Sequence, residues 1–489
     1  MANVTTQHPE YASMAAFWSR CRDLIEGSDT VKRGSAYDPL GRSYSYLPTP
    51  PGMSAQDFEF YKARAQFFNA MARTVTALSG AVFTKPPTVE CPDETKAQLE
   101  DLTSQDEPLD VVAQKIITEV ISVGRVGVFL EMPEKAPAGT PPYWAMRLAQ
   151  NITNWRAARV GDDPAKLVLV VIAEETEAPD EFGHDCVTQY RQLALVDGKY
   201  QVRVWTRKDT GTKTAEYEPG EWIVPMRRGV ALDFIPFTFV GIDGVSPCVS
   251  KPPLLDLANV NVGHFRNSAD HEQGLFNTAI PTYFAAGMAA NSTPLKVGGS
   301  AAWMLPQGAT AGVLEFSGAG MKAILDAMTA KEKQMASLGA RLLEDPSANA
   351  AETATAVRMR HSGEGAALRT IAGAGSTALT TLLRWHAWWA GTGGIDQSIK
   401  VTLAQEFSNI RATPEEVKAL VLQVQAGLIG YETFYANLQK GGWTREGVSA
   451  AEELKAIEAE EPMRPEPPEP TPPKPGDPPM PMPPNPAVA

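Results

Sequence analysis

Three stretches decide the fold of this chain. They are PLLDLANVNVGHFRNSADHEQGLF (residues 253–276), MKAILDAMTAKEKQMASLGARLL (residues 321–343) and TATAVRMRHSGEGAALRTIAGAGSTALTTLLRWHAWW (residues 353–389). In the last two, apolar residues recur at spacings of three and four, which predicts helices that each bury one face. These positions are Met321, Ile324, Met328, Met335, Leu338 and Leu342 in the second stretch, and Leu368, Ile371, Leu379, Leu382 and Trp389 in the third.

The segments that separate these helices differ from them in composition. Residues 277–320 are rich in Gly, Ala, Thr and Pro, and short strands are expected at residues 282–284 and 301–305. Residues 344–352 form a polar break that contains Pro346, which cannot continue a helix. Each glycine of the long third helix lowers its intrinsic stability by about 1 kcal/mol relative to Ala. Close packing must therefore hold that helix.

The amino-terminal half mixes helices with strands. After a capping-box-like start at Ser54, an apolar stripe from Phe58 to Val82 predicts one helix of about seven turns. A second helix is expected at residues 109–123. The strands that follow are expected at residues 126–130, 166–173, 222–225 and 235–240, with a hairpin of 189–196 and 199–206 around Asp197-Gly198. The fold class is therefore α+β.

The carboxy-terminal part is helical and then changes character. A strand is expected at residues 399–403. Three short helices follow, the first opening at Thr413-Pro414 and the last covering residues 445–460. Half of residues 461–488 are Pro, so this tail is expected to be disordered or extended rather than part of a core.

Composition argues against several classes of protein. No run of about 18 apolar residues exists, so no membrane span is expected, and the polar start does not resemble a secretory signal. The four cysteines include no CxxC pair, which fits folding in a reducing cytosol. The formal net charge of -13 argues against tight, sequence-independent binding of nucleic acid. It is compatible with a wall past which DNA slides, or simply with ordinary solubility.

No motif for catalysis is present. The sequence lacks GxxxxGK[ST], GxSxG and HExxH, so neither enzymatic activity nor a metal or other cofactor is expected. The His-rich stretch at residues 264–272 is interpreted as a polar helix face rather than a metal site. The tryptophans of residues 385–389 are expected in a core or subunit contact rather than in stacking on bases.

Several short strings along the chain resemble those of one portal-like family of tailed-phage proteins, long labelled only as a domain of unknown function. The resemblance covers roughly residues 8–445, and the order of the strings carries it more than any single one. The strings are His8-Pro9-Glu10-Tyr11, Tyr61-Lys62-Ala63-Arg64-Ala65, Phe68-Asn69, Phe83-Thr84-Lys85-Pro86-Pro87, Gln150-Asn151-Ile152, Asn154-Trp155, Ile235-Pro236-Phe237 and Glu352-Thr353-Ala354-Thr355-Ala356.

The order of helix, β-rich excursion, returning helix, short loop and long helix also resembles the layout of phage portal subunits. The resemblance implies an α+β wing over residues 1–250, followed by a portal-type stem, clip and crown. The stem helices would cover residues 251–276 and 321–343, the β-rich clip 277–320 and the tunnel loop 344–352. A long wing helix and strand (353–410), a helical crown (411–460) and the disordered tail (461–489) would complete the chain.

Membership of this family would make the chain a structural subunit. The resemblance implies a homo-oligomeric ring, with twelve copies expected, at one capsid vertex of a virion assembled in the host cytoplasm. The ring would be the conduit for DNA packaging and ejection. Its implied partners are the terminase large subunit, head–tail connector proteins and the major capsid protein. Clip residues Tyr283 and Trp303 are the candidate contacts to such partners.

Contacts to viral double-stranded DNA are expected to be non-specific, weak and local. Twelve copies would carry a formal charge of -156, twelve times -13, which repels phosphate along a channel. The tunnel loop carries no base, which predicts steric or valve-like action there. The candidate DNA-facing residues are Lys322, Lys331, Lys333 and Arg341 on the stem side, and Asp345, Pro346, Ser347 and Asn349 in the loop.

Two other interpretations stay open. One is another self-assembling virion or scaffold protein, which associates through residues 353–389 without a DNA channel. The other is an enzyme of an unrecognised hydrolase type, although no catalytic constellation converges in the sequence.

Overall fold

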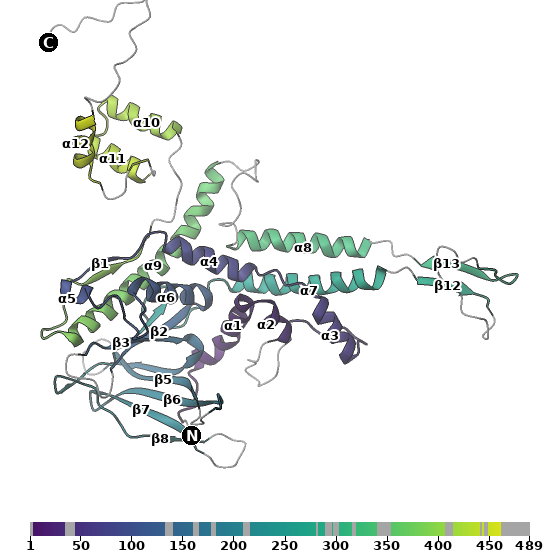
Figure 1. The fold of residues 1–489 in the computed structure, drawn as a ribbon, viewed down its shortest axis with the longest axis horizontal. Coiled ribbons are helices and arrows are strands. Elements are labelled where there is room, and N and C mark those ends of the chain that lie inside the picture. Colours follow the sequence, from purple (N-terminus) through teal and green to yellow (C-terminus); the bar gives the residue numbers. More distant parts are fainter. Residues whose placement is uncertain are drawn as a thin grey trace, which may run out of the picture. The chain divides into compact units, whose positions relative to one another are not determined.

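The structure, a computed structural model, divides the chain into two compact units, Met1–Phe407 and Ser408–Ala489. It describes residues 3–34, 45–132, 140–159, 166–177, 182–208, 216–279, 282–288, 296, 303–314, 319–339, 354–405, 414–440, 443–444 and 448–460. Among these residues all strands belong to the first unit, which combines them with helices (Figure 1). The predicted α+β class is confirmed.

Helices form the amino-terminal part of the first unit. They are α1 (Pro9–Glu26), α2 (Ser28–Arg33), α3 (Ala55–Arg64), α4 (Ala70–Val82), α5 (Asp93–Lys96) and α6 (Leu109–Val123). The bounds of α6 agree with the prediction, whereas α1 was not predicted. Local chemistry nevertheless encodes its start, because His8 Nδ1 accepts the Glu10 N–H and Pro9 suits the first turn. The face of α1 that carries Trp18 and Cys21 is fully buried.

The single helix expected from Phe58 to Val82 is two helices, α3 and α4, separated at residues 65–69. Two polar side chains of α7 (Leu255–Thr278) stabilise this break. Ser268 Oγ accepts the Gln66 N–H at 3.1 Å, and Asn261 Nδ2 donates to the Phe68 carbonyl at 2.8 Å. The prediction was wrong because the side chains that hold the break are remote in sequence, while the apolar spacing continues through it.

Two antiparallel sheets make up most of the β structure. The first has the order β11 (Phe237–Gly241), β2 (Arg125–Glu131), β3 (Tyr143–Leu148), and β3 is its edge. The second is a meander of β4 (Ile152–Ala158), β5 (Lys166–Glu177), β6 (Cys186–Val196), β7 (Lys199–Lys208) and β8 (Glu216–Pro219). The predicted β6–β7 hairpin is confirmed, with φ of 51° at Asp197 and 71° at Gly198, as a primed turn requires.

Shorter strand pairs complete the described β structure. β1 (Thr88–Glu90) pairs with β14 (Lys400–Thr402), and β9 (Met226–Arg227) pairs with β10 (Val230–Ala231). The strand expected at residues 222–225 is wrong, because only Ile223 makes a bridge there, to Val202.

Three of the strings that resemble the portal-like family meet where α1 joins the second sheet. The His8 ring stacks on Trp155 with ring centroids 4.0 Å apart, and the Tyr11 hydroxyl donates to the Gln150 carbonyl. The Arg125 guanidinium lies 4.1 Å from the centre of the Trp155 ring. These contacts tie the amino-terminal helix to the second sheet, and Arg125 joins the second sheet to the first.

After β11 the chain follows the predicted order of helix, β segment, helix and long helix. The elements are α7, β12 (Thr282–Ala286), β13 (Thr310–Leu314), α8 (Ala319–Ser337) and α9 (Ala354–Ala390). The strand expected at residues 301–305 is misplaced, since residues 303–305 are not in a strand and β13 begins at Thr310.

Helix α9 packs into the core of the first unit along its small residues. A Cβ added at Gly375 would lie 2.5 Å from Ile117 Cδ1 of α6, so only glycine allows this approach. Near the end of α9, Trp385 and Trp388 pack against Phe234, with ring centroids 5.3 and 5.8 Å apart. The three tryptophans of residues 385–389 are half-buried and pack against the core, which is one of the two environments predicted for them.

The second unit contains α10 (Pro414–Gln425), α11 (Tyr431–Lys440) and α12 (Ala450–Glu460). Its last helix begins five residues later than expected. The Pro-rich tail, residues 461–489, lies outside the described residues.

Candidate functional site

Helices α7 and α8 form an antiparallel hairpin. Gly263 of α7 lies opposite Lys331, whereas Gly274, eleven residues on, lies opposite Met321, ten residues before Lys331. A Cβ at Gly274 would lie 2.3 Å from Met321 Sδ, so the Met321 side chain fills the space beside this glycine. The buried residues of α7 end at Ala269, and its last two turns therefore leave the core and pack on α8.

Near the base of the hairpin a buried histidine joins the two helices. His264 is 4% exposed, and its Nε2 lies 3.1 Å from Glu332 Oε1. Asp270, directly after the last buried residue of α7, instead accepts a hydrogen bond from the Tyr61 hydroxyl at 2.7 Å. Among the described residues no three His, Cys, Asp or Glu side chains are arranged to hold a metal ion. His264 therefore lies between α7 and α8 rather than on a polar surface, and Asp270 links α7 to α3.

The basic residues predicted to face DNA separate into different environments. Lys322 and Lys333 are exposed, and their separation of eleven residues places them about 20° apart on one face of α8. Lys331 is half-buried, and its stem lies against Gly263, where a Cβ would come within 3.2 Å of Lys331 Cε. Lys331 thus faces α7. Arg341 and the loop residues Asp345, Pro346, Ser347 and Asn349 lie outside the described residues.

The β12–β13 ribbon follows α7 within four residues and precedes α8, so it lies at the far end of the hairpin (Figure 1). The two predicted clip residues meet there, because the rings of Tyr283 and Trp303 pack edge to face with centroids 6.0 Å apart. Trp303 Nε1 donates to the Lys296 carbonyl at 2.6 Å. Across the ribbon Phe284 covers Gly312, where a Cβ would lie 2.9 Å from the ring.

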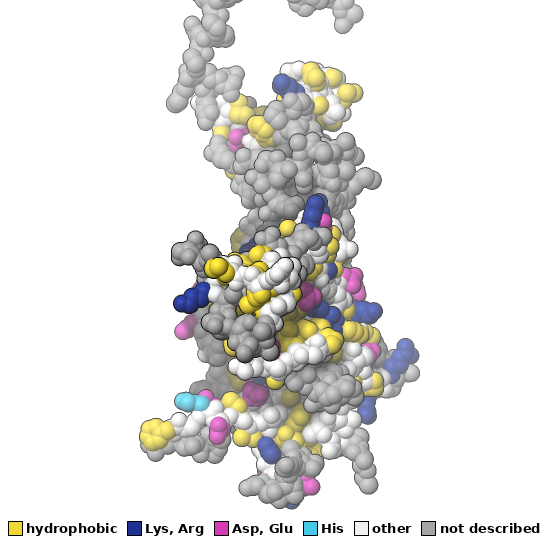
Figure 2. Space-filling model, turned by 90° about the vertical axis from the view of Figure 1, so that its right-hand side faces the viewer, with side chains coloured by type: hydrophobic (Ala, Val, Ile, Leu, Met, Phe, Trp, Pro, Cys, Tyr) yellow, Lys and Arg dark blue, Asp and Glu magenta, His cyan; other side chains and the backbone are white. Residues whose placement is uncertain are grey.

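Large apolar side chains are exposed at this end of the hairpin. Figure 2 faces this side of the molecule, and hydrophobic side chains gather near its centre. Folded monomers seldom expose so many large apolar side chains in one region. They are Leu275, Phe276, Tyr283, Phe284, Met304, Val313 and Leu325, with exposed fractions from 42% for Phe284 to 94% for Met304.

Sequence reasoning found Tyr283 but missed Leu275, Phe276 and Leu325. Apolar residues on a helix predict a buried face, and only the point where α7 leaves the core shows that these side chains are uncovered. Leu275 and Phe276 lie 18 residues, or five turns, after the buried Leu257 and Ala258, so they continue the apolar stripe of α7 beyond the core.

The geometry defines a helical hairpin, ending in a β ribbon, on an α+β body. The same segment is where a family model matches: residues 253–390, from α7 to the end of α9, match the family described as "Domain of unknown function (DUF4055)". That description assigns no activity. No curated protein matches the chain.

The solved structures that resemble this chain do so only distantly. A chain of "Virion of native gene transfer agent (GTA) particle" has 12% identity and a TM-score of 0.41, over 80% of this chain and 96% of its own. A chain of "Neck of empty GTA particle computed with C6 symmetry" has 14% identity and a TM-score of 0.40, over 79% and 94%. Likeness at this level does not by itself define a function.

None of the helices in the described ranges is both long enough and apolar enough to cross a bilayer.

Proposed function

We propose that this chain is a portal-type structural subunit of a phage-like virion, which assembles into a ring and gives DNA a passage at one capsid vertex. The observation that carries the proposal is the α7–ribbon–α8 hairpin followed by the long α9, the order in which the sequence resembles portal subunits. In this proposal the chain has no catalytic role.

The surface of the hairpin supports separate roles for its parts. The exposed apolar side chains around Phe276, Tyr283 and Met304 suit contact between copies and with terminase or connector proteins. The exposed face of α8 with Lys322 and Lys333 suits weak contact with DNA phosphates. The contacts of α7 with α1, α3 and α4 hold the hairpin on the body of each subunit.

Electron microscopy of the purified protein in negative stain tests the proposal. The expected result is a ring with a central hole, of about twelve copies by the resemblance. Only monomers or filaments, across a range of salt concentrations, would reject a portal role and favour another self-assembling virion protein.

A second experiment tests the path of DNA. The double variant K322E/K333E should form normal rings but yield particles with less packaged DNA. A matched control, K199E/K251E, changes two exposed lysines elsewhere in the first unit and should package normally. Equal packaging by both variants would reject the assignment of this α8 face to the channel.

A further inference from the structure

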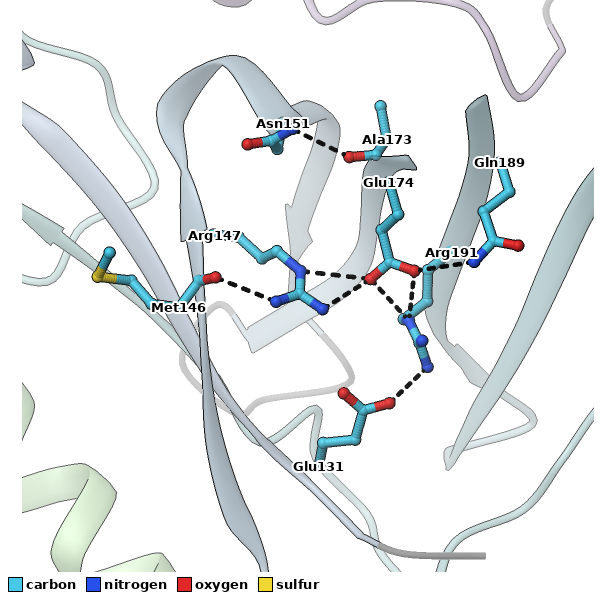
Figure 3. A network of polar contacts seen from close by, with 8 residues as sticks. All are labelled: Glu131, Met146, Arg147, Asn151, Ala173, Glu174, Gln189 and Arg191. Atoms are coloured by element: carbon cyan, nitrogen blue, oxygen red, sulfur yellow. Dashed lines mark hydrogen bonds and ion pairs between the residues drawn. The ribbon is translucent and has the colours of Figure 1, made fainter. Parts of the chain in front are cut away.

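A groove of about 410 Å³ lies between the two sheets of the first unit. Its walls are the edge strand β3, through Met146 and Leu148, and the last part of β5, through Ala173 and Glu175. Arg147 and Glu174 form its floor (Figure 3). None of these residues belongs to the helical hairpin described above.

The β3 wall presents unpaired backbone donors to the groove. In β3 the Trp144 N–H points away from β2, because it donates to the Leu102 carbonyl at 2.6 Å. The N–H groups of Met146 and Leu148 share that direction, since backbone groups alternate along a strand. Neither has a hydrogen-bond partner among the described residues.

The β5 wall is unpaired on the same side. Its pairing with β4 ends at Ile172, and beyond that point β5 pairs with β6 alone. The Ala173 carbonyl points away from β6 and accepts a hydrogen bond from the Asn151 side chain at 3.2 Å. By the same alternation the N–H and C=O of Glu175 point into the groove, without a partner in the described part of the chain.

The floor residues Arg147 and Glu174 belong to a set of ion pairs that continues below the groove to Arg191 and Glu131 (Figure 3). Glu174 accepts hydrogen bonds from Arg147 at 2.8 Å and from Arg191 at 3.0 Å, and Arg191 also pairs with Glu131 at 2.7 Å. Burial alone would raise the pKa of Glu174, but Arg191 and Arg147 outweigh it and hold that pKa below its ordinary value. The floor is therefore charged at neutral pH, balanced and internally satisfied, and Glu175 on the wall is left as a further negative charge.

We propose that this groove is a docking site for an extended, basic peptide segment of another protein, which adds as a short strand between β3 and β5. Two facing strand edges with unpaired N–H groups are the arrangement to which an extended peptide adds by main-chain hydrogen bonds. Residues 146–148 span about 10 Å of strand, enough for three residues of the peptide. Alternate side chains of the peptide would face Glu175, so Lys or Arg there gives charge complementarity.

The charge of the chain itself favours a different protein over a second copy. Each copy carries a formal charge of -13, and an acidic surface disfavours docking beside Glu175. The inference goes beyond the proposed ring and is tested on the isolated full-length chain.

Fluorescence anisotropy with three labelled peptides tests the proposal. The first is acetyl-Thr-Val-Lys-Val-Lys-Thr-amide, the second is the same peptide with N-methylated central amides, and the third has Glu in place of both Lys. We expect the first to bind and each of the others to bind at least about tenfold more weakly, a difference of about 1.4 kcal/mol. No binding by the first, or equal binding by all three, would overturn the proposal.

Two variants locate the binding. M146P removes an N–H that does not pair with β2, and an edge position tolerates Pro, so the fold should persist while affinity for the first peptide falls at least about tenfold. If M146P does not fold, E175K decides: it should reverse the preference between the Lys and Glu peptides. The control E218K, on exposed β8, should change neither. A change of oligomeric state in E175K, or unchanged binding in both groove variants, would reject the assignment.

Discussion

Replacing Glu174 by Gln removes the charge that connects the two sheets of the first unit. Glu174 lies on β5, and its side chain is 11% exposed. It pairs with Arg147 of the first sheet and with Arg191 of the second, while Gln189 donates to it at 3.3 Å. A glutamine of nearly equal size keeps the packing but leaves both arginines without this carboxylate.

The expected loss of unfolding free energy follows from these contacts. Breaking a buried ion pair by removing one partner costs about 3–5 kcal/mol. Here Arg191 keeps Glu131, and the Arg147 and Arg191 side chains are 24% and 21% exposed, so water replaces part of the lost interaction. We therefore expect E174Q to lose about 2–4 kcal/mol at pH 7.

Urea unfolding followed by tryptophan fluorescence at several pH values checks this. The folded pKa of Glu174 is below its ordinary value of 4.5, so its stabilisation is complete above pH 4.5 and is lost as the pH falls through the folded pKa. The difference between the native protein and E174Q should thus shrink below pH 4.5. E175Q, at the neighbouring position, should change stability by less than about 0.5 kcal/mol. A loss under about 1 kcal/mol for E174Q at pH 7, or a loss that persists unchanged at low pH, would refute the reasoning.

Three further substitutions test the packing of the first unit. G127A should lower the free energy of unfolding by about 1–3 kcal/mol through overpacking, because the new Cβ would lie 2.4 Å from Phe237 Cζ and 2.6 Å from Ile152 Cδ1. An unchanged midpoint of thermal unfolding would contradict this. N261A should lower the free energy of unfolding by about 1–3 kcal/mol, because it leaves the Phe68 carbonyl without its buried hydrogen-bond donor. A midpoint of urea unfolding equal to that of the native protein would count against the role given to this hydrogen bond. Burial lowers the pKa of His386 to about 4. The free energy of unfolding should therefore fall by up to about 3 kcal/mol as the pH decreases from 6.5 to 4, because the unfolded chain binds the proton first. H386F should abolish this pH dependence. Parallel pH profiles of the two proteins in this window would reject the assignment to His386.

The fold was predictable where a pattern is complete within one segment. Helix α6 and the β6–β7 hairpin carry their own periodicity and turn residues, and both were placed well. The break between α3 and α4 was not predictable, since Asn261 and Ser268 stabilise it from α7. Helix α1 was missed although its sequence carries the helical spacing, at Tyr11, Ala15, Trp18, Cys21 and Leu24.

The candidate site was predictable to a smaller degree. Tyr283 and Trp303 were both placed in one β segment, but their ring contact was not predicted, because the second strand was misplaced. The ion pairs of Glu174 could not be foreseen, because they depend on how β3 of one sheet lies relative to β5 of the other. Sequence spacing gives the face of a strand, but not the strand of another sheet that lies opposite.

The lysines of α8 refine what a weak DNA contact would mean in the proposed ring. Lys331 is excluded from the exposed face by its packing on Gly263, which leaves Lys322 and Lys333, with Asp326 exposed between them. This face then carries one net positive charge per copy, on a chain whose total is -13. One charge per copy, repeated around a channel, attracts phosphate without a deep minimum at any position, and salt screens it beyond about 8–10 Å. Passage of DNA in either direction would then meet little resistance from binding, so control of the direction must lie in a motor and in steric elements rather than in this helix.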